Sequence, residues 1–321
     1  MDAHSRDRMS IEEGADRVVG QCLAVRKGES VLVIADTDKK SIGEAIFNAA
    51  RRAEAEPMLT LIHPAKKSPH EPPEPLAKLM LEVDVIICAT TMSMTHAIAR
   101  VRASKAGARI ASLPGVTEEM MSEGGITADY KEVQRILRIL ERKLRNARKV
   151  HLTSGGGTDA TFDVRGREWI AKDTGLATRK GDVTTLPAGE IFVAPIEGTA
   201  EGRLVFDVRL LDLLEQPATV VLKEGYVTRV AGAKNAVMEM NKGGKDGRNL
   251  GKFGIGLNPK TRPKGPVVEA QKSLGTVHAV FGGSAPFGGK VACDVRVDGI
   301  MTDATLEIEG RKILERGKLA V

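Results

Sequence analysis

The feature that most constrains the fold is a change in hydrophobic periodicity near residue 148. Before it, short continuous apolar runs alternate with helical segments. The run Glu29–Asp36 is apolar throughout its middle and ends in a polar residue, which is typical of a strand buried on both faces of a parallel sheet. It is followed by Ser41–Ala55, whose apolar residues recur at helical spacing. A helix after a buried strand indicates a crossover to a parallel neighbour.

This alternation repeats through the first half of the chain. Further strands are expected at Pro57–Ile62, Val83–Ala89 and Ala108–Leu113. Helices are expected at Ile11–Val25, from the end of the Pro-rich loop Pro69–Pro75 to about Glu82, and at Met92–Ala106. A long amphipathic helix is expected at Tyr130–Arg148. The rhythm predicts that residues 1–148 form an α/β domain with a doubly wound parallel sheet.

From Val150 onward, apolar residues alternate with polar ones in short runs separated by glycines, which is typical of antiparallel sheet. Residues 149–321 are therefore predicted to form a mostly antiparallel β domain that carries the site. One helical segment, Lys234–Lys242, precedes the glycine cluster Gly243–Gly256. The expected strands are His151–Ser154, Thr158–Val164, Glu190–Pro195, Arg203–Val208, Ala218–Lys223, Tyr226–Val230, Thr276–Phe281, Lys290–Val297 and Thr305–Ile308.

Composition excludes several classes of protein. The 321 residues carry 48 Lys and Arg against 42 Asp and Glu, and only 3% are aromatic, so the charge bias is weak and few rings could stack on bases. These values disfavour a nucleic-acid partner. No apolar run reaches the length of a bilayer span, and the first ten residues lack the apolar stretch of a secretory signal, so we expect no membrane association and a cytoplasmic location.

Common cofactor motifs are missing. The first strand ends in Asp36-Thr37-Asp38-Lys39 with no G-x-G-x-x-G, which argues against a nicotinamide enzyme. The stretches Gly243–Gly247 and Gly282–Ser284 do not have P-loop spacing and are interpreted as turns. The three cysteines are far apart and show no C-x-x-C pair for zinc or redox chemistry.

Two histidines and two carboxylates merit a site hypothesis. His96 follows a predicted parallel strand, where an open α/β sheet presents its crevice, and His278 lies in a strand between glycine-rich turns. Glu190 begins an apolar strand and Asp298 ends one. A buried carboxylate needs a metal or a salt bridge, and the residues alone leave both open.

Several strings resemble the aminopeptidase T superfamily of metallo-aminopeptidases, to which the iron-dependent 2,5-dihydroxypyridine 5,6-dioxygenases are related. The resemblance extends in order over nearly the whole chain and implies a homodimer. Its strings are Ser93–Arg100, Gly107–Gly115, Thr153–Asp159, Leu186–Gly202, Asn249–Pro259, Gly275–His278 and Val295–Gly299.

The resemblance implies a metal site at the positions of Glu190, His278 and Asp298. Lys252 and Arg296 stand where the peptidases have a further Glu and His. In the dioxygenases the iron triad is expected at Lys252, Arg296 and Asp298. Ammonium and guanidinium groups have no lone pair to offer a metal.

The resulting prediction is an aminopeptidase-like hydrolase homologue whose pocket contains Lys252, Arg296 and His278 as catalytic residues, with His96 at its edge. In this version a divalent metal (Zn, Co or Mn) held by Glu190, His278 and Asp298 would activate water for attack on a peptide N-terminus. The alternatives are a metal-free enzyme acting on a small anionic molecule, a ring-cleaving dioxygenase-like homologue, and a non-catalytic binding protein.

Overall fold

The computed structural model describes residues 10–68 and 70–320, which form two compact units. The first unit extends to residue 133 and includes residues 173–188; the second comprises residues 134–172 and 189–320. The chain passes from the first unit to the second within the helix α6 (Tyr130–Leu144), ahead of the change in periodicity near residue 148. It then returns once to the first unit, and the periodicity of the sequence gave no sign of this return.

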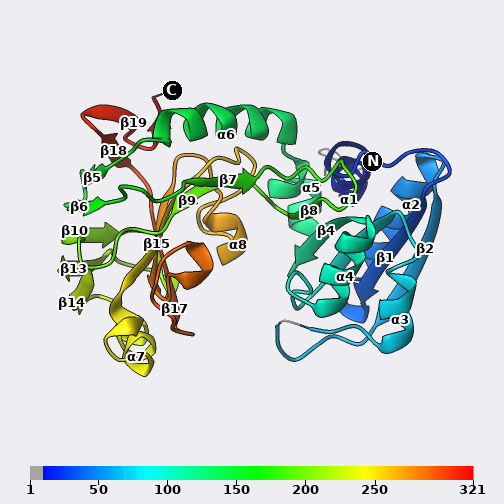
Figure 1. Cartoon of the computed structure of the whole chain (residues 1–321), viewed down its shortest axis with the longest axis horizontal. Coiled ribbons are helices and arrows are strands. Elements are labelled where there is room, and N and C mark those ends of the chain that lie inside the picture. The colour runs from blue at the N-terminus through cyan, green and yellow to red at the C-terminus, as the bar shows by residue number, and fades with distance from the viewer. Residues whose placement is uncertain (1–9, 69, 321) are drawn as a thin grey trace, which may run out of the picture. The chain divides into compact units, whose positions relative to one another are not determined.

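The first unit is built on a parallel sheet (Figure 1). Its strands lie in the order β2-β1-β3-β4-β8, and each pairing is parallel. The predicted α/β class with a parallel amino-terminal sheet is therefore confirmed. The strand bounds are β1 (Ser30–Asp36), β2 (Glu56–Ile62), β3 (Val85–Thr90), β4 (Arg109–Pro114) and β8 (Val183–Thr185).

Helices cover both faces of this sheet. Leu32 and Ile34 of β1 belong to a buried cluster with residues of α3 (Glu74–Leu79) and α4 (Ile98–Ala106). On the opposite face α2 (Lys40–Arg52) packs so closely that a Cβ on Gly43 would lie 2.8 Å from the Cβ of Ala35. The alternation of side chains along a strand explains why one buried strand supports both layers.

The helices of the first unit differ from expectation at their ends. α1 (Ile11–Asp16) continues as a π-helix over Arg17–Cys22 rather than as one α-helix to residue 25. α4 begins at Ile98 instead of Met92, because the preceding residues form turns in which Thr95 bonds to Ser112. A short helix, α5 (Glu118–Ser122), starts behind the N-cap Thr117.

The second unit contains two antiparallel sheets, as the period-two pattern predicted. Sheet B has the order β14-β13-β10-β6-β5-β18-β19-β20, and sheet C has the order β12-β11-β17-β16-β15-β9-β7. The bounds in sheet B are β5 (Lys149–Ser154), β6 (Asp159–Asp163), β10 (Glu201–Phe206), β13 (Ala218–Lys223), β14 (Tyr226–Ala231), β18 (Ala304–Ile308), β19 (Arg311–Glu315) and β20 (Lys318–Leu319). Those in sheet C are β7 (Ile170–Asp173), β9 (Glu190–Val193), β11 (Arg209–Leu210), β12 (Asp212–Leu213), β15 (Leu250–Gly256), β16 (Val277–Gly282) and β17 (Arg296–Met301), and the helices are α7 (Lys234–Lys242) and α8 (Val267–Ala270).

Aromatic rings pack between sheets B and C. Phe162 of β6 lies 4.8 Å from Phe253 of β15, and Phe206 of β10 lies 6.1 Å from Phe281 of β16, measured between ring centroids. Trp169 adds an edge contact to Phe253. Because side chains alternate along a strand, the neighbours of Phe253 in β15 point to the face of sheet C away from this core.

The second unit differs from expectation in two strands. The second half of the glycine cluster, where no strand was predicted, is the buried central strand β15, whose glycines allow close contact: a Cβ on Gly251 would lie 2.5 Å from the carbonyl oxygen of Gly283. The strand expected at Lys290–Val297 begins only at Arg296. Residues 290–295 have no regular secondary structure, and the loop before them, residues 284–290, contains a 3-10 turn at Ala285–Phe287.

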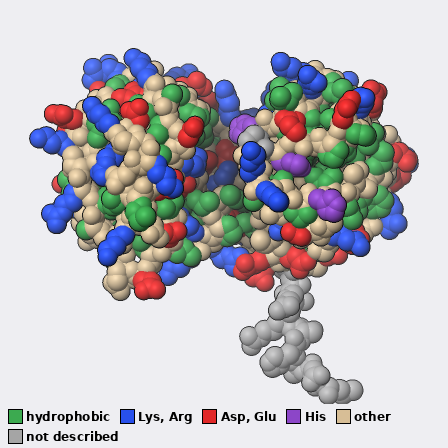
Figure 2. Space-filling model, turned by 90° about the horizontal axis from the view of Figure 1, so that it is seen from below, with side chains coloured by type: hydrophobic (Ala, Val, Ile, Leu, Met, Phe, Trp, Pro, Cys, Tyr) green, Lys and Arg blue, Asp and Glu red, His purple; other side chains and the backbone are tan. Residues whose placement is uncertain are grey.

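Among the described residues, no helix is both long enough and apolar enough to cross a bilayer. On the face shown in Figure 2, Lys and Arg side chains are interspersed with Asp and Glu side chains. The absence of a secretory signal was predicted from the first ten residues, of which the structure describes only Ser10.

Candidate functional site

The pairing register of sheet C places the predicted site residues on one face. Gly254 of β15 pairs with His278 of β16 on one side and with Phe192 of β9 on the other, so these three positions share a face. Lys252 lies two residues before Gly254 and therefore points the same way. Glu190 lies two residues before Phe192, and Asp298 and Arg296 pair with positions 280 and 282, two and four residues after His278. All three therefore belong to this face, opposite the aromatic core.

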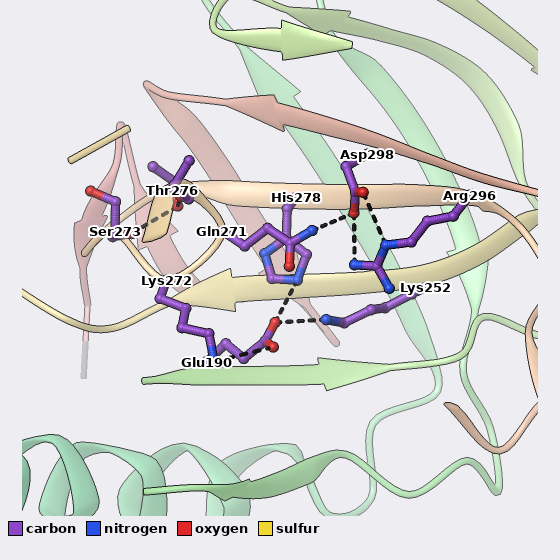
Figure 3. Close-up of polar contacts among 10 residues, drawn as sticks. Glu190, Lys252, Gln271, Lys272, Ser273, Thr276, His278, Arg296 and Asp298 are labelled. Carbon is purple, nitrogen blue, oxygen red and sulfur yellow. Dashed lines mark hydrogen bonds and ion pairs between the residues drawn. The ribbon is translucent and has the colours of Figure 1, made fainter. Parts of the chain in front are cut away.

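Glu190 is the centre of the buried part of the site (Figure 3). Its Oε2 atom accepts a hydrogen bond from Lys252 Nζ at 2.7 Å and lies 2.9 Å from Nε2 of His278. Its Oε1 atom lies 3.9 Å from Nζ of Lys272, which follows α8. Lys252 is 3% exposed and His278 is fully buried. One carboxylate thus faces two ammonium groups and an imidazole, away from bulk water.

A glycine in β15 makes room for this contact. A Cβ on Gly254 would lie 2.3 Å from Nε2 of His278 and 3.0 Å from the carbonyl oxygen of Ile191. No other residue type would fit without moving the imidazole or the backbone of β9. The run Gly-Lys-Phe-Gly therefore places a charge on the outer face, a ring in the core and a gap beneath His278.

The charges of the cluster set its protonation. Burial raises the pKa of Glu190, but the charge of Lys252, the contact with His278 and the charge of Lys272 outweigh burial and hold that pKa well below its usual range. Glu190 is therefore a carboxylate. Burial lowers the pKa of Lys252, and the neighbouring Glu190 opposes this shift only in part.

His278 is a neutral imidazole at physiological pH. Burial and the charge of Lys252 lower its pKa, and Glu190 does not restore it. Its Nδ1 atom is buried and has no hydrogen-bond partner among the residues that the structure describes. A buried polar atom without a partner costs about 1–3 kcal/mol, so this nitrogen is a place where a ligand or water would be stabilised.

Asp298 forms a second ion pair, closer to the surface. Arg296 donates to both of its oxygens, from Nε to Oδ2 at 3.0 Å and from an Nη atom to Oδ1 at 2.8 Å, and the amide of Gln271 donates to Oδ1. Burial alone would lower the pKa of Arg296, but the charge and hydrogen bonds of Asp298 raise this pKa above its usual value. The Arg296 side chain remains 47% exposed, so this guanidinium faces solvent while Lys252 does not.

Two phenylalanine rings connect the two ion pairs. The ammonium of Lys252 lies 4.2 Å from the ring centroid of Phe192 and 5.5 Å from that of Phe287. The guanidinium of Arg296 lies 5.9 Å from the ring of Phe287. Such cation–π contacts contribute about 0.5–2 kcal/mol each, more where water is excluded. We call the outer face of sheet C bounded by Glu190, Lys252, His278, Arg296 and Asp298, with these rings, the cup.

The loop that carries Phe287 is held by Glu197. One oxygen of this carboxylate accepts hydrogen bonds from Oγ of Ser284 at 2.8 Å and from the backbone N–H of Lys290 at 2.7 Å, and the other pairs with Arg167 at 2.5 Å. Arg167 also donates to the carbonyl oxygen of Gly288. Both ends of the loop are therefore fixed, which keeps the ring against the cup.

The residues of the cup do not fit a divalent metal ion. Within residues 10–68 and 70–320, no group of three His, Cys, Asp or Glu side chains is arranged to hold one. Glu190 is bound by Lys252, and Asp298 uses both oxygens on Arg296. The ammonium and guanidinium supply positive charge and no lone pair, which opposes a cation at this place.

Sequence reasoning found part of this site. The structure brings Lys252, His278 and Glu190 into contact and pairs Arg296 with Asp298. It does not bring Asp298 into contact with the other two predicted metal ligands. His96 belongs to the first unit, where it lies exposed in the turn ahead of α4, so its place at the edge of the pocket stays a prediction.

Sequence reasoning missed Phe192, Phe287, Gln271 and Lys272. Only Phe192 carried a usable signal, since it lies two residues after Glu190 in the predicted strand and therefore shares its face. The other three follow strands or short helices, where spacing alone does not predict direction.

Comparison with known proteins places the chain in a family. The family model described as 2,5-dihydroxypyridine 5,6-dioxygenase matches residues 14–321. The chain belongs to this dioxygenase family. A search of curated proteins by sequence gave no match.

Two solved structures share the fold of this dioxygenase-family chain. The 2,5-dihydroxypyridine dioxygenase from Pseudomonas putida KT2440 has a TM-score of 0.76 at 18% identity, with 97% of each chain covered. Wild-type AmpT from Thermus thermophilus has a TM-score of 0.68 at 17% identity, with 97% of this chain and 99% of that chain covered. The family model confirms the resemblance to the dioxygenases, and AmpT shares the fold, whereas aminopeptidase activity receives no specific support.

Proposed function

We propose that this member of the dioxygenase family is a metal-free enzyme that binds a small anionic molecule in the cup. The carrying observation is the position of Lys252, whose buried ammonium lies 2.7 Å from Glu190, a predicted metal ligand. A fixed organic cation there supplies the positive charge that a metal would otherwise supply. It also keeps the carboxylate neutralised without any ion from solution.

Arg296 is the group that would meet the anion first. Its Nε and one Nη hydrogen are used by Asp298, which leaves three of its five N–H donors for a ligand. The guanidinium is half exposed and is held in place by Asp298 and Phe287. A carboxylate or phosphate on the substrate matches the paired donors of such a group.

Lys252 would carry the chemical step. Burial lowers the pKa of its ammonium, which makes proton release easier, and Glu190 at 2.7 Å is positioned to stabilise the charged form when the proton returns. The lowered pKa suits a general acid and base or an amine nucleophile. His278, which is neutral and has its Nε2 atom 2.9 Å from Glu190, would orient that carboxylate.

The aminopeptidase-like hydrolase remains another enzymatic reading, beside a ring-cleaving dioxygenase-like homologue. The hydrolase requires Glu190, His278 and Asp298 to share one metal ion, whereas Asp298 is bound by Arg296 and Gln271 instead. The non-catalytic reading is favoured by the pairing of both carboxylates with internal cations. The homodimer and the cytoplasmic location stay predictions alongside these readings.

The test compares Arg296→Gln and Lys252→Met with the wild-type protein. We expect small carboxylates or phosphates to raise the melting temperature of the wild type, Arg296→Gln to lose this effect, and Arg229→Gln, an exposed cation of β14, to keep it. Metal content after loading with Zn, Co or Mn should stay far below one ion per chain. Stoichiometric metal that is lost in Glu190→Gln, together with cleavage of peptide N-termini, would replace this proposal with the hydrolase.

A further inference from the structure

A second possible binding site lies in the second unit, outside the cup. A groove of about 730 Å³ is lined by the carboxyl-terminal half of α6, the turn that follows it, and the hairpin of β18 and β19. Figure 1 shows α6 and this hairpin near the carboxyl terminus. Its volume falls within the ~300–1,000 Å³ typical of pockets for small molecules.

The groove combines an apolar floor with basic walls. Ile139, Ile308 and Ile313 supply apolar surface, and the exposed side chains Arg142, Lys143, Arg311 and Lys312 surround it. Lys312 pairs with Glu315, which does not line the groove, and Nε of Arg142 donates to the carbonyl oxygen of Arg138.

The single acidic residue in the lining offsets only part of these charges. One oxygen of Glu309 accepts hydrogen bonds from the backbone N–H groups of Arg148 and Lys149, both at 3.1 Å. The carboxylate is thus directed to the turn after α6. A ligand in the groove therefore meets four cationic side chains, of which Lys312 is paired with Glu315, against one carboxylate.

The same contact joins the two elements that line the groove. Glu309 and Gly310 form the two-residue link between β18 and β19 and have φ angles of +51° and +73°. Two consecutive residues with positive φ are typical of a tight hairpin turn, in which Asn, Asp or Gly is usual at the first position. Glu309 adopts this conformation while its side chain fixes the hairpin to the turn after α6. A preformed site loses less entropy when a ligand binds.

The sequence shows that this concentration of charge is local. Residues 131–149 carry eight Lys and Arg against two Glu, a net charge of +6, which equals the formal net charge of the whole chain. The remaining residues therefore balance to zero. A field of one sign beside an apolar floor favours a ligand with a polyvalent anionic head and an apolar body.

We propose that this groove binds a small organic phosphate whose apolar body rests on the isoleucine floor and whose phosphate meets Lys143 and Arg311. This site is separate from the cup, because it lies at α6 and sheet B, whereas the cup is formed on the outer face of sheet C. The proposal does not depend on the proposed function.

The experiment is calorimetric titration of the full-length protein with 1-naphthyl phosphate and, separately, inorganic phosphate. We expect the naphthyl ester to bind more tightly, and Lys143→Gln/Arg311→Gln to lower its affinity by roughly tenfold or more, since two charge-assisted contacts are lost. The matched control is Arg138→Gln/Arg145→Gln, which removes the same charge from exposed positions of the same region outside the groove lining.

Four results decide the proposal, three against it and one for it. Equal affinities in the control and groove variants would show that general charge attraction alone explains binding, and would overturn it. Inorganic phosphate binding as tightly as the ester would overturn the assigned ligand class. A loss of affinity in Lys252→Met but not in the groove variant would place the ester in the cup and would overturn the second site. Selective loss in the groove variant, with melting temperature unchanged, supports it.

Discussion

Replacing Lys252 with methionine tests the internal ion pair directly. The substitution keeps the length and much of the volume of the side chain but removes the charge that lies 2.7 Å from Glu190. Breaking a buried ion pair costs about 3–5 kcal/mol because the remaining charge stays buried. His278 at 2.9 Å and Lys272 at 3.9 Å still face the carboxylate, so we expect the lower end, about 3 kcal/mol.

Removing both charges should reverse most of this loss. In Glu190→Gln/Lys252→Met the carboxylate that would be left without its ammonium partner is also removed. Replacing both members of a buried ion pair by uncharged residues often changes stability little. We therefore expect the double variant to be within about 1 kcal/mol of the wild type. Lys223→Met, at an exposed position of β13, is the matched control and should change little.

Tryptophan fluorescence during urea unfolding is the assay. Trp169 is the single tryptophan of the chain, is 4% exposed, and lies 6.3 Å from the ring of Phe253, the residue next to Lys252. Its signal therefore reports unfolding of the second unit. A loss of about 3 kcal/mol corresponds to a midpoint lower by about 1–2 M urea. An unchanged midpoint in Lys252→Met, or a double variant less stable than the single one, would refute the reasoning.

Further predictions concern pH, the glycine under the histidine, and the hairpin. Because the folded-state pKa of His278 is lowered, the free energy of unfolding should begin to fall as pH drops below about 6.5. His278→Asn should remove this pH dependence, measured by urea titrations at a series of pH values. The folded-state pKa of Glu190 is also lowered, so its contribution is present above about 4.5 and is lost as pH falls further; Glu190→Gln should flatten this lower phase. Gly254→Ala should lower the melting temperature and abolish anion binding, since its Cβ would lie 2.3 Å from Nε2 of His278, and normal binding would contradict the described packing. Glu309→Ala should lower the free energy of unfolding by about 1–3 kcal/mol through two lost hydrogen bonds at a positive φ, measured by the same fluorescence assay.

Sequence patterns were sufficient where one local rule determined the structure. Continuous apolar runs such as Val85–Ala89 predicted parallel strands, because such strands are covered on both faces. Alternation of apolar and polar residues predicted the antiparallel sheets, because this pattern is typical of strands that are covered on one face. The strand β15 was missed because Gly251, Gly254 and Gly256 obscure its alternation. These glycines are explained only by the close contacts that the folded chain makes there, such as the contact of Gly254 with His278 of β16.

The structure places the predicted site residues on one face, but their pairing was not predicted. Resemblance indicated Glu190, Lys252, His278, Arg296 and Asp298, and the register of sheet C places all five on one face. Glu190 and Lys252 lie on adjacent strands, β9 and β15, that are far apart in the sequence, and Lys272 approaches Glu190 from the segment after α8. These contacts are tertiary, whereas Arg296 and Asp298 are two residues apart in one strand.

The return of residues 173–188 to the first unit has a consequence for dissecting the protein. The backbone crosses between the units three times, and β8 pairs with the outer side of β4 through residues 110–112. A fragment ending at residue 148 would lack β8 and would leave that side of β4 open to pairing with other chains. A single protease cut in α6 would likewise leave the two pieces joined through the sheet, so neither unit corresponds to one uninterrupted stretch of coding sequence.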